Sequence, residues 1–115
     1  MSDPIYRRDK LLVWLEGEIQ TPPFSKAARL EAGKLLRRLQ AGELIGLPQS
    51  RPLPIVGLRC HELRIPDAQL AWRIVYRTER DAIVILEVFS KKTDILSKRV
   101  VDASRRRLAE YVRAR

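Results

Sequence analysis

Residues 60–89, CHELRIPDAQLAWRIVYRTERDAIVILEVF, decide the fold class of this chain. Three stretches rich in β-branched and aromatic residues follow one another, at residues 60–65, 71–77 and 82–89. Such stretches are typical of β-strands. The separators at residues 66–69 and 78–81 are short and contain turn-forming residues. Because short turns join antiparallel neighbours, we expect an antiparallel meander.

Two helices are predicted, one on each side of this meander in the sequence. Ser25 is suited to cap a helix over residues 26–41, and Gly42 is suited to end it. The apolar residues of this helix share one stripe at helical spacing: Ala28, Ala32, Leu35, Leu36 and Leu39. A second helix is expected from Ser97 or Lys98 to Tyr111 or beyond. Its apolar face comprises Val101, Leu108 and Val112, with Val100 and Tyr111 beside them.

The other segments complete a single α+β domain over residues 1–115. The continuous apolar run LLVWL at residues 11–15 predicts a strand buried on both faces and therefore central in the sheet. Residues 42–59 are rich in Gly and Pro and form an irregular connection, a kind of loop that is often functional. Residues 1–9 are polar and expected to be flexible. We therefore expect a small, mostly antiparallel sheet of about four strands with helices packed on it.

The composition favours a polyanionic partner. The chain has 115 residues, of which 45% are apolar, enough for the core of one domain. Lys and Arg total 23 against 14 Asp and Glu, which gives a net charge of +9, and 17 of the 23 bases are Arg. The guanidinium group suits phosphate, so nucleic acid is a natural partner. The last 25 residues alone carry a net charge of +6.

Several classes of protein and site are excluded or disfavoured. The single cysteine, Cys60, excludes an intramolecular disulfide and a cysteine-based zinc cluster. The single histidine, His61, lies on the same side of its strand as Leu63 and Ile65, so we expect it toward the core rather than in catalysis. No stretch is long and apolar enough to span a bilayer, and the first residues lack a secretory signal. We expect a cytoplasmic protein that needs no metal or cofactor.

The alternation of side chains along each strand separates two faces of the sheet. One set in each strand is wholly apolar: Leu63 and Ile65, then Trp72, Ile74 and Tyr76, then Val84, Leu86 and Val88. If these sets face the first helix, charged side chains gather on the opposite face: Glu62, Arg64, Arg73, Arg77, Glu87 and Lys91. This face would be either a lattice of cross-strand Glu–Arg pairs or a surface that binds phosphate.

Four motifs in order resemble one known family. They are HELRI at residues 61–65, WRIVY at 72–76, IVILEVFSKKT at 83–93 and RRRLAEY at 105–111. Together with SKAARLEAGKLLRRLQAGE at 25–43 and LPQSRPLP at 47–54, they resemble the RelE/ParE toxin superfamily. Within it, they are most similar to the HigB-like branch, often described as phage-related toxins. The resemblance spans about residues 10–111.

The resemblance implies a microbial ribonuclease-type fold, with helices on one face of a small antiparallel sheet. It also implies a metal-independent endoribonuclease that cuts mRNA, commonly on the ribosome. A cognate antitoxin, often of the helix-turn-helix type, silences such toxins. The resemblance implies that Arg73 is at the position where related toxins have an arginine near the scissile phosphate, and that Lys92 and Lys91 are the basic residues after the last strand. It also places Glu62 and Arg64 on the strand where relatives carry catalytic or RNA-contacting side chains.

These positions predict a site. Arg64, Arg73 and Lys92 would surround the phosphate, and Glu62 or a lysine would act as general base, with Lys91 or Lys98 as the acid. Further RNA contacts are expected from Lys91, Arg77, Phe89, Lys98 and Arg99, where Phe89 would either stack on a base or seal the sheet edge. Two alternatives stay open: a ParE-like toxin that inhibits DNA gyrase without cutting RNA, and a basic nucleic-acid-binding accessory protein.

Overall fold

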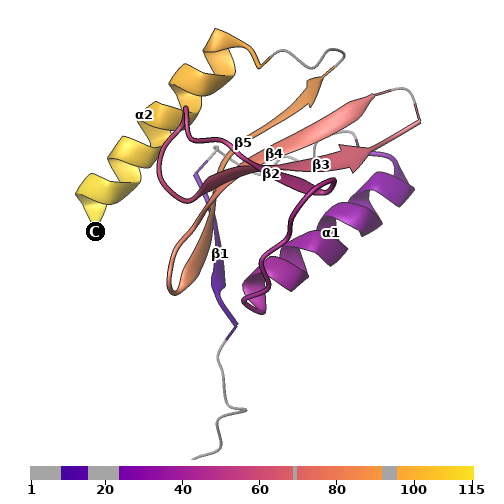
Figure 1. Ribbon diagram of the computed structural model, residues 1–115, viewed down its shortest axis with the longest axis horizontal. Helices are drawn as coiled ribbons and strands as arrows, with labels where there is room; N and C mark the ends of the chain where they lie inside the picture. Colours follow the sequence, from indigo (N-terminus) through magenta and orange to yellow (C-terminus); the bar gives the residue numbers. More distant parts are fainter. Residues whose placement is uncertain (1–8, 16–23, 69, 92–95) are drawn as a thin grey trace, which may run out of the picture.

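The computed structural model describes residues 9–15, 24–68, 70–91 and 96–115. In this part of the chain, five strands and two helices follow one another (Figure 1). They are β1 (Leu11–Trp14), α1 (Lys26–Gln40), β2 (Ser50–Pro52), β3 (Cys60–Pro66), β4 (Ala71–Thr78), β5 (Ala82–Lys91) and α2 (Lys98–Ala114).

All five strands form one sheet in the order β1-β5-β4-β3-β2. The pairs β2–β3, β3–β4 and β4–β5 are antiparallel, so the predicted meander and the α+β class are confirmed. Strand β1 runs parallel to β5. The short strand β2 lies inside the segment 42–59, which the sequence predicted to be irregular.

The predicted central position of residues 11–15 is wrong, because β1 lies at the edge of the sheet that the described strands form, next to β5. Its apolar run has another cause. Leu12 and Trp14 pack against the cluster on the α1 side of the sheet, whereas Val13 and Leu15 pack against the cluster on the α2 side. A strand covered on both faces is apolar throughout even when one of its edges is free.

The helices cover opposite faces of the sheet (Figure 1). This corrects the expectation, implied by the resemblance, that they share one face. The Ser25 hydroxyl caps α1 by accepting a hydrogen bond from the Ala28 N–H at 3.0 Å, and the predicted stripe is the buried one: Ala28, Ala32, Leu35, Leu36 and Leu39. Gly42 follows the helix with a φ of 93°, a conformation that favours glycine.

Helix α2 begins as predicted, since the Ser97 hydroxyl accepts a hydrogen bond from the Val100 N–H. Its buried residues are Val100, Val101, Ala103, Ser104 and Leu108. Val112 is 49% exposed, contrary to the predicted face. The apolar packing of α2 against the sheet ends with Leu108 and the half-buried Tyr111, so the side chain of the next residue faces solvent.

A β-bulge in β5 corrects the predicted alternation. Val75 pairs with Glu87 while Tyr76 pairs with Ile85, which leaves Leu86 as an extra residue. Val84 and Leu86 therefore pack on the α2 side, whereas Val88 packs on the α1 side, so these three residues do not form the single set expected. An extra residue shifts the alternation by one position, and apolar residues on both sides of it conceal the shift in the sequence.

Candidate functional site

Two rows of side chains cross the sheet on the face opposite α1. In the first row, Glu62 of β3 lies opposite Val75 of β4, which lies opposite Glu87 of β5. In the second row, Arg64 lies opposite Arg73, which lies opposite Phe89. The predicted gathering of charged residues on this face is therefore confirmed for β3, β4 and the end of β5.

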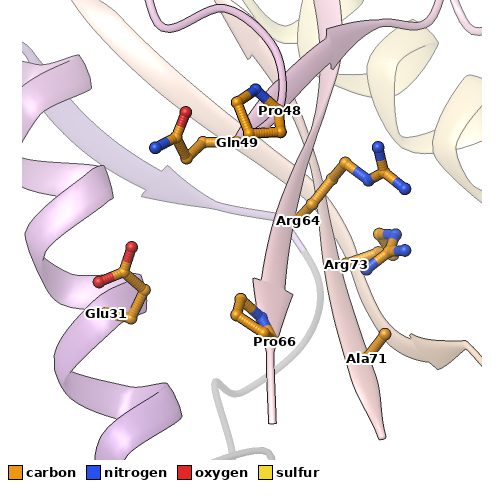
Figure 2. A pocket seen from close by; sticks show the side chains of 7 residues that line it. All are labelled: Glu31, Pro48, Gln49, Arg64, Pro66, Ala71 and Arg73. Carbon is orange, nitrogen blue, oxygen red and sulfur yellow. The ribbon is translucent and has the colours of Figure 1, made fainter.

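Arg64 and Arg73 form an arginine pair at the centre of the second row. Their side chains point to the same side, away from α1 (Figure 2). The Arg73 side chain is only 8% exposed, and its Nε lies 3.6 Å from Oε1 of Glu62. Arg64 is half-buried, and within the described part of the chain no hydrogen bond or ion pair of its guanidinium is found. Arg64 thus presents a positive charge that no described carboxylate neutralises.

Glu62 holds two arginines in place. Its carboxylate has no exposed surface, and its Oε1 accepts a hydrogen bond from the Arg51 Nε at 2.8 Å. The same oxygen faces Arg73. We call these three residues, Glu62, Arg51 and Arg73, the Glu62 cluster. A carboxylate that is completely buried between two guanidinium groups orients them, but a substrate hydroxyl has no access to it in this conformation.

Arg51 is a site residue that sequence reasoning missed. It lies in β2, opposite Glu62, with 34% of its side chain exposed. The segment 42–59 contains no apolar alternation that would predict a strand, so nothing in the sequence aligned Arg51 with Glu62. The signal that could have revealed it is charge balance, because a buried glutamate needs a cationic partner.

Helix α2 contributes two further arginines beside the first row. The Arg107 Nη1 lies 3.2 Å from Oε1 of Glu87 and donates a hydrogen bond to the Leu86 carbonyl at 2.8 Å. The Arg99 Nη1 lies 4.0 Å from Oε2 of Glu87, and 76% of the Arg99 side chain is exposed. The structure therefore brings the predicted Arg99 to the flank of this face, together with Arg107, which was not predicted.

A pocket of about 410 Å³ adjoins the arginine pair. Its lining residues come from α1, the segment before β2, and strands β3 and β4: Glu31, Pro48, Gln49, Arg64, Pro66, Ala71 and Arg73. Figure 2 shows Glu31 and Gln49 on one side of the end of β3, and the arginine pair on the other. A ligand here would meet cationic groups on one side and uncharged or acidic hydrogen-bonding groups on the other.

Arg77 lies apart from the arginine pair, although it shares their face. It belongs to a second group around Glu79, whose carboxylate is 5% exposed. Oε1 of Glu79 lies 2.9 Å from the Arg59 Nη2 and 3.5 Å from the Arg77 Nε, and its Oε2 lies 2.6 Å from the Arg115 Nη1. We call these four residues, Glu79, Arg59, Arg77 and Arg115, the Glu79 cluster. It joins the end of α2 to the sheet.

The other predicted site residues have different outcomes. Phe89 is half-buried and packs against the cluster on the α2 side, at the end of the second row. Lys98 is exposed and pairs with Asp102 one helical turn further on, at 2.7 Å. Lys91 pairs with Ala71 through the backbone at the end of β5. Lys92 lies outside the described residues.

His61, which was expected toward the core, and the single cysteine, Cys60, lie in structural positions. His61 stacks on Tyr76 with ring centroids 5.4 Å apart, on the α1 side. Burial raises the pKa of the Cys60 thiol to about 11, so at neutral pH the thiol is protonated and a poor nucleophile.

Neither a cluster of metal ligands nor a membrane-spanning helix is found in the part of the chain that the structure describes. Among the described residues, no group of three or more His, Cys, Asp and Glu side chains is arranged to hold a metal ion. In the same part of the chain, no helix has the length and apolar character needed to cross a membrane.

Comparison with known proteins identifies a family. No curated protein and no solved structure is significantly similar to the chain. The sequence profile of the family described as phage-derived protein Gp49-like (DUF891) matches residues 23–109, which include α1, all the antiparallel strands and most of α2. This family is associated with the toxins of toxin–antitoxin systems. The chain therefore belongs to the Gp49-like family of phage-derived proteins.

Proposed function

We propose that the chain is the toxin of a type II toxin–antitoxin system and acts as a metal-independent endoribonuclease on mRNA. The arginine pair carries this proposal, because Arg64 and Arg73 lie directly opposite each other on neighbouring strands and point to the same side. With Arg51 they provide three guanidinium groups against the single carboxylate of Glu62. The family's association with toxins supports the same class.

The reaction would proceed through the RNA's own 2′-hydroxyl group. Its oxygen attacks the adjacent phosphorus, the bond to the 5′-oxygen breaks, and a 2′,3′-cyclic phosphate forms. A base takes the 2′-hydroxyl proton and an acid gives a proton to the departing 5′-oxygen. The crowded phosphorane between these steps gains negative charge, which Arg64 and Arg73 would stabilise. Each well-placed donor of this kind typically contributes about 3–4 kcal/mol.

The geometry changes the role we propose for Glu62. A fully buried carboxylate is poorly placed to take a proton from RNA, so we assign Glu62 to positioning Arg51 and Arg73 rather than to the base. Proton transfer then falls to the lysines at the end of β5 and beyond, Lys91 and Lys92. Lys92 also remains the third cationic group proposed beside the phosphate.

The proposed partners follow from the family and the charge. A cognate antitoxin, of the helix-turn-helix type in the branch that the sequence resembles, would bind and silence the protein. The mRNA would be cut on the ribosome, in the cytoplasm. A net charge of +9 favours association both with mRNA and with the RNA of the ribosome.

Induction of the chain in a bacterium, followed by mapping of transcript 5′ ends, tests the function. We expect growth arrest and new 5′ ends within mRNA for the wild type, and neither for Arg64→Ala. Arg37→Ala is the matched control, since Arg37 is exposed on α1 on the opposite face. Intact mRNA together with inhibition of gyrase supercoiling by the purified protein would instead support the ParE-like alternative. Normal growth would support the accessory-protein alternative.

A further inference from the structure

The pocket beside the arginine pair lies where the edge of β3 is no longer covered. Strand β2 pairs with β3 only from His61 to Leu63, and the Gln49 carbonyl accepts a hydrogen bond from the Arg64 N–H at 2.8 Å just beyond. The remaining end of β3, together with α1, encloses about 410 Å³. This volume is within the usual range of about 300–1,000 Å³ for small-ligand sites.

Glu31 and Gln49 form the polar wall of this pocket. Both side chains are half-buried, and Glu31 comes from α1 while Gln49 precedes β2. Within the described part of the chain, no hydrogen bond or ion pair of either side chain is found. The charge of Glu31 interacts with that of Arg38, but the carboxylate and the Gln49 amide both keep their hydrogen-bonding capacity for a ligand. The hydrogen bond from the Arg64 N–H fixes the backbone of Gln49 beside β3.

The hydrogen-bonding chemistry of this wall selects among nucleobases. A carboxylate only accepts hydrogen bonds, while a glutamine amide both accepts and donates. Adenine and cytosine present an exocyclic amino group beside a ring nitrogen acceptor, which such a pair can bind. Uracil reverses this order, because O4 replaces the amino donor and N3–H replaces the ring acceptor, so in the same orientation a carbonyl oxygen would face the Glu31 carboxylate. Pro48 and Pro66 supply apolar surface for the ring.

We propose that this pocket is a base-binding subsite next to the phosphate site, and that Glu31 and Gln49 select adenine or cytosine over uracil. The phosphate would lie on the Arg64 and Arg73 side, and the adjacent base would enter the pocket around the end of β3. This assignment rests on the proposed function, because it takes RNA as the ligand. It names two specificity residues that contact the base without contacting the reacting atoms.

Binding of uncleavable RNA tests the proposal without relying on catalysis. The probes are fluorescein-labelled 12-nucleotide 2′-O-methyl RNAs of A, C or U, which lack the attacking hydroxyl, measured by fluorescence anisotropy. We expect the wild type to bind the A and C probes at least fivefold more tightly than the U probe. Glu31→Gln and Gln49→Ala should each reduce this ratio at least threefold. The control Glu110→Gln, at an exposed position on α2, should leave the ratio unchanged.

The ratio of the affinity for the A or C probe to the affinity for the U probe separates base recognition from general charge effects. Glu31→Gln removes a negative charge and so raises affinity for all three probes, but only base recognition changes their ratio. Equal binding of the three probes by the wild type would overturn the proposal, as would a ratio that survives both substitutions. If the ratio changes as expected but the mRNA stays intact in cells, the subsite stands and the endoribonuclease proposal fails. If Arg64→Ala abolishes cleavage while neither Glu31→Gln nor Gln49→Ala changes the ratio, the endoribonuclease proposal stands and the base-binding subsite fails.

Discussion

The Glu62 cluster and the Glu79 cluster have the same kind of ion pairs, but they differ in the positive charge that remains beside them. In each, one glutamate with at most 5% exposure contacts several arginines on the α2 side of the sheet. In the Glu79 cluster, all three guanidinium groups contact the carboxylate, and the contacts connect α2 to the sheet. Next to the Glu62 cluster stands Arg64, for which no carboxylate partner is found among the described residues.

This difference shows why counting arginines does not identify a phosphate site. A guanidinium that already contacts a buried carboxylate has much of its charge neutralised and is held in a structural role. A neighbouring guanidinium without such a contact keeps its charge for a ligand. The Glu62 cluster therefore has beside it an arginine whose charge no described carboxylate neutralises, as the proposed phosphate site requires, whereas the Glu79 cluster connects the end of α2 to the sheet.

The largest expected effect is on catalysis, from Arg64→Ala. Removing one donor to the transition state should lower RNA cleavage by about 10²–10³-fold. Thermal stability should stay within about 2 °C of the wild type, because Arg64 has no described partner to lose. Cleavage of a labelled mRNA and thermal unfolding measure the two effects. Unimpaired cleavage by this variant would remove the distinction between the two clusters.

Glu79→Gln should show the opposite pattern. It leaves three guanidinium groups without their carboxylate, and we expect the free energy of unfolding to fall by about 2–3 kcal/mol. This loss is small for the breaking of a buried ion pair, because Arg59 and Arg115 are about half exposed. Urea denaturation measures it, with the exposed Glu110→Gln as control. RNA cleavage below the unfolding temperature should be unchanged, and a loss of cleavage in a folded variant would contradict the structural role.

The same cluster should make stability depend on pH. Burial raises the pKa of Glu79, but the Arg59 hydrogen bond and the charges of Arg77 and Arg115 outweigh it, so the net pKa is lowered. A lowered pKa in the folded state stabilises the protein above the unfolded-state value of about 4.3. This stabilisation is lost as the pH falls through the folded-state pKa. The difference in unfolding free energy between wild type and Glu79→Gln should therefore shrink below about pH 4.3, and a constant difference would argue against it.

The smallest expected effect is on the rate at which the Cys60 thiol is labelled. Cys60 lies beside residues of the Glu79 cluster, so its labelling is sensitive to that cluster. Cys60 is buried, follows Arg59 and pairs with Arg77 across β3 and β4. Burial raises the pKa of its thiol to about 11, so labelling by a thiol reagent at pH 8 should be slow in the wild type. In Glu79→Gln we expect labelling several-fold faster, and in Arg64→Ala no change. Equal rates in the two variants would show that the clusters do not differ in this respect.

Much of this arrangement could be predicted from alternation and capping. The helix stripes, the capping serines and the shared face of Glu62, Arg64 and Arg73 depend on local spacing, which a sequence displays directly. The edge position of β1 could not be predicted, because an apolar run reports covered faces and not hydrogen-bonded edges.

Arg51 and the pocket wall depend on long-range placement. Residues 42–59 lack the periodicity that would fix their partner, so neither the pairing of Arg51 with Glu62 nor the position of Gln49 was visible. Glu31 is one polar residue on a helix with several, and only the fold directs it toward β3. The sequence thus predicted the shared face of the arginine pair, where we propose that phosphate binds, and missed the side proposed to hold the base.

The extra residue in β5 also determines where α2 can dock. Leu86 supplies an apolar contact beneath the helix, and its carbonyl accepts the hydrogen bond from Arg107. Arg107 also contacts the neighbouring carboxylate of Glu87, so one side chain recognises both residues of the irregularity. The bulge therefore offers Arg107 two adjacent groups to contact, and these contacts tie α2 to this part of β5. The contacts of Arg107 thus hold α2 beside the row of Glu62, Val75 and Glu87, on the same face of the sheet as the arginine pair.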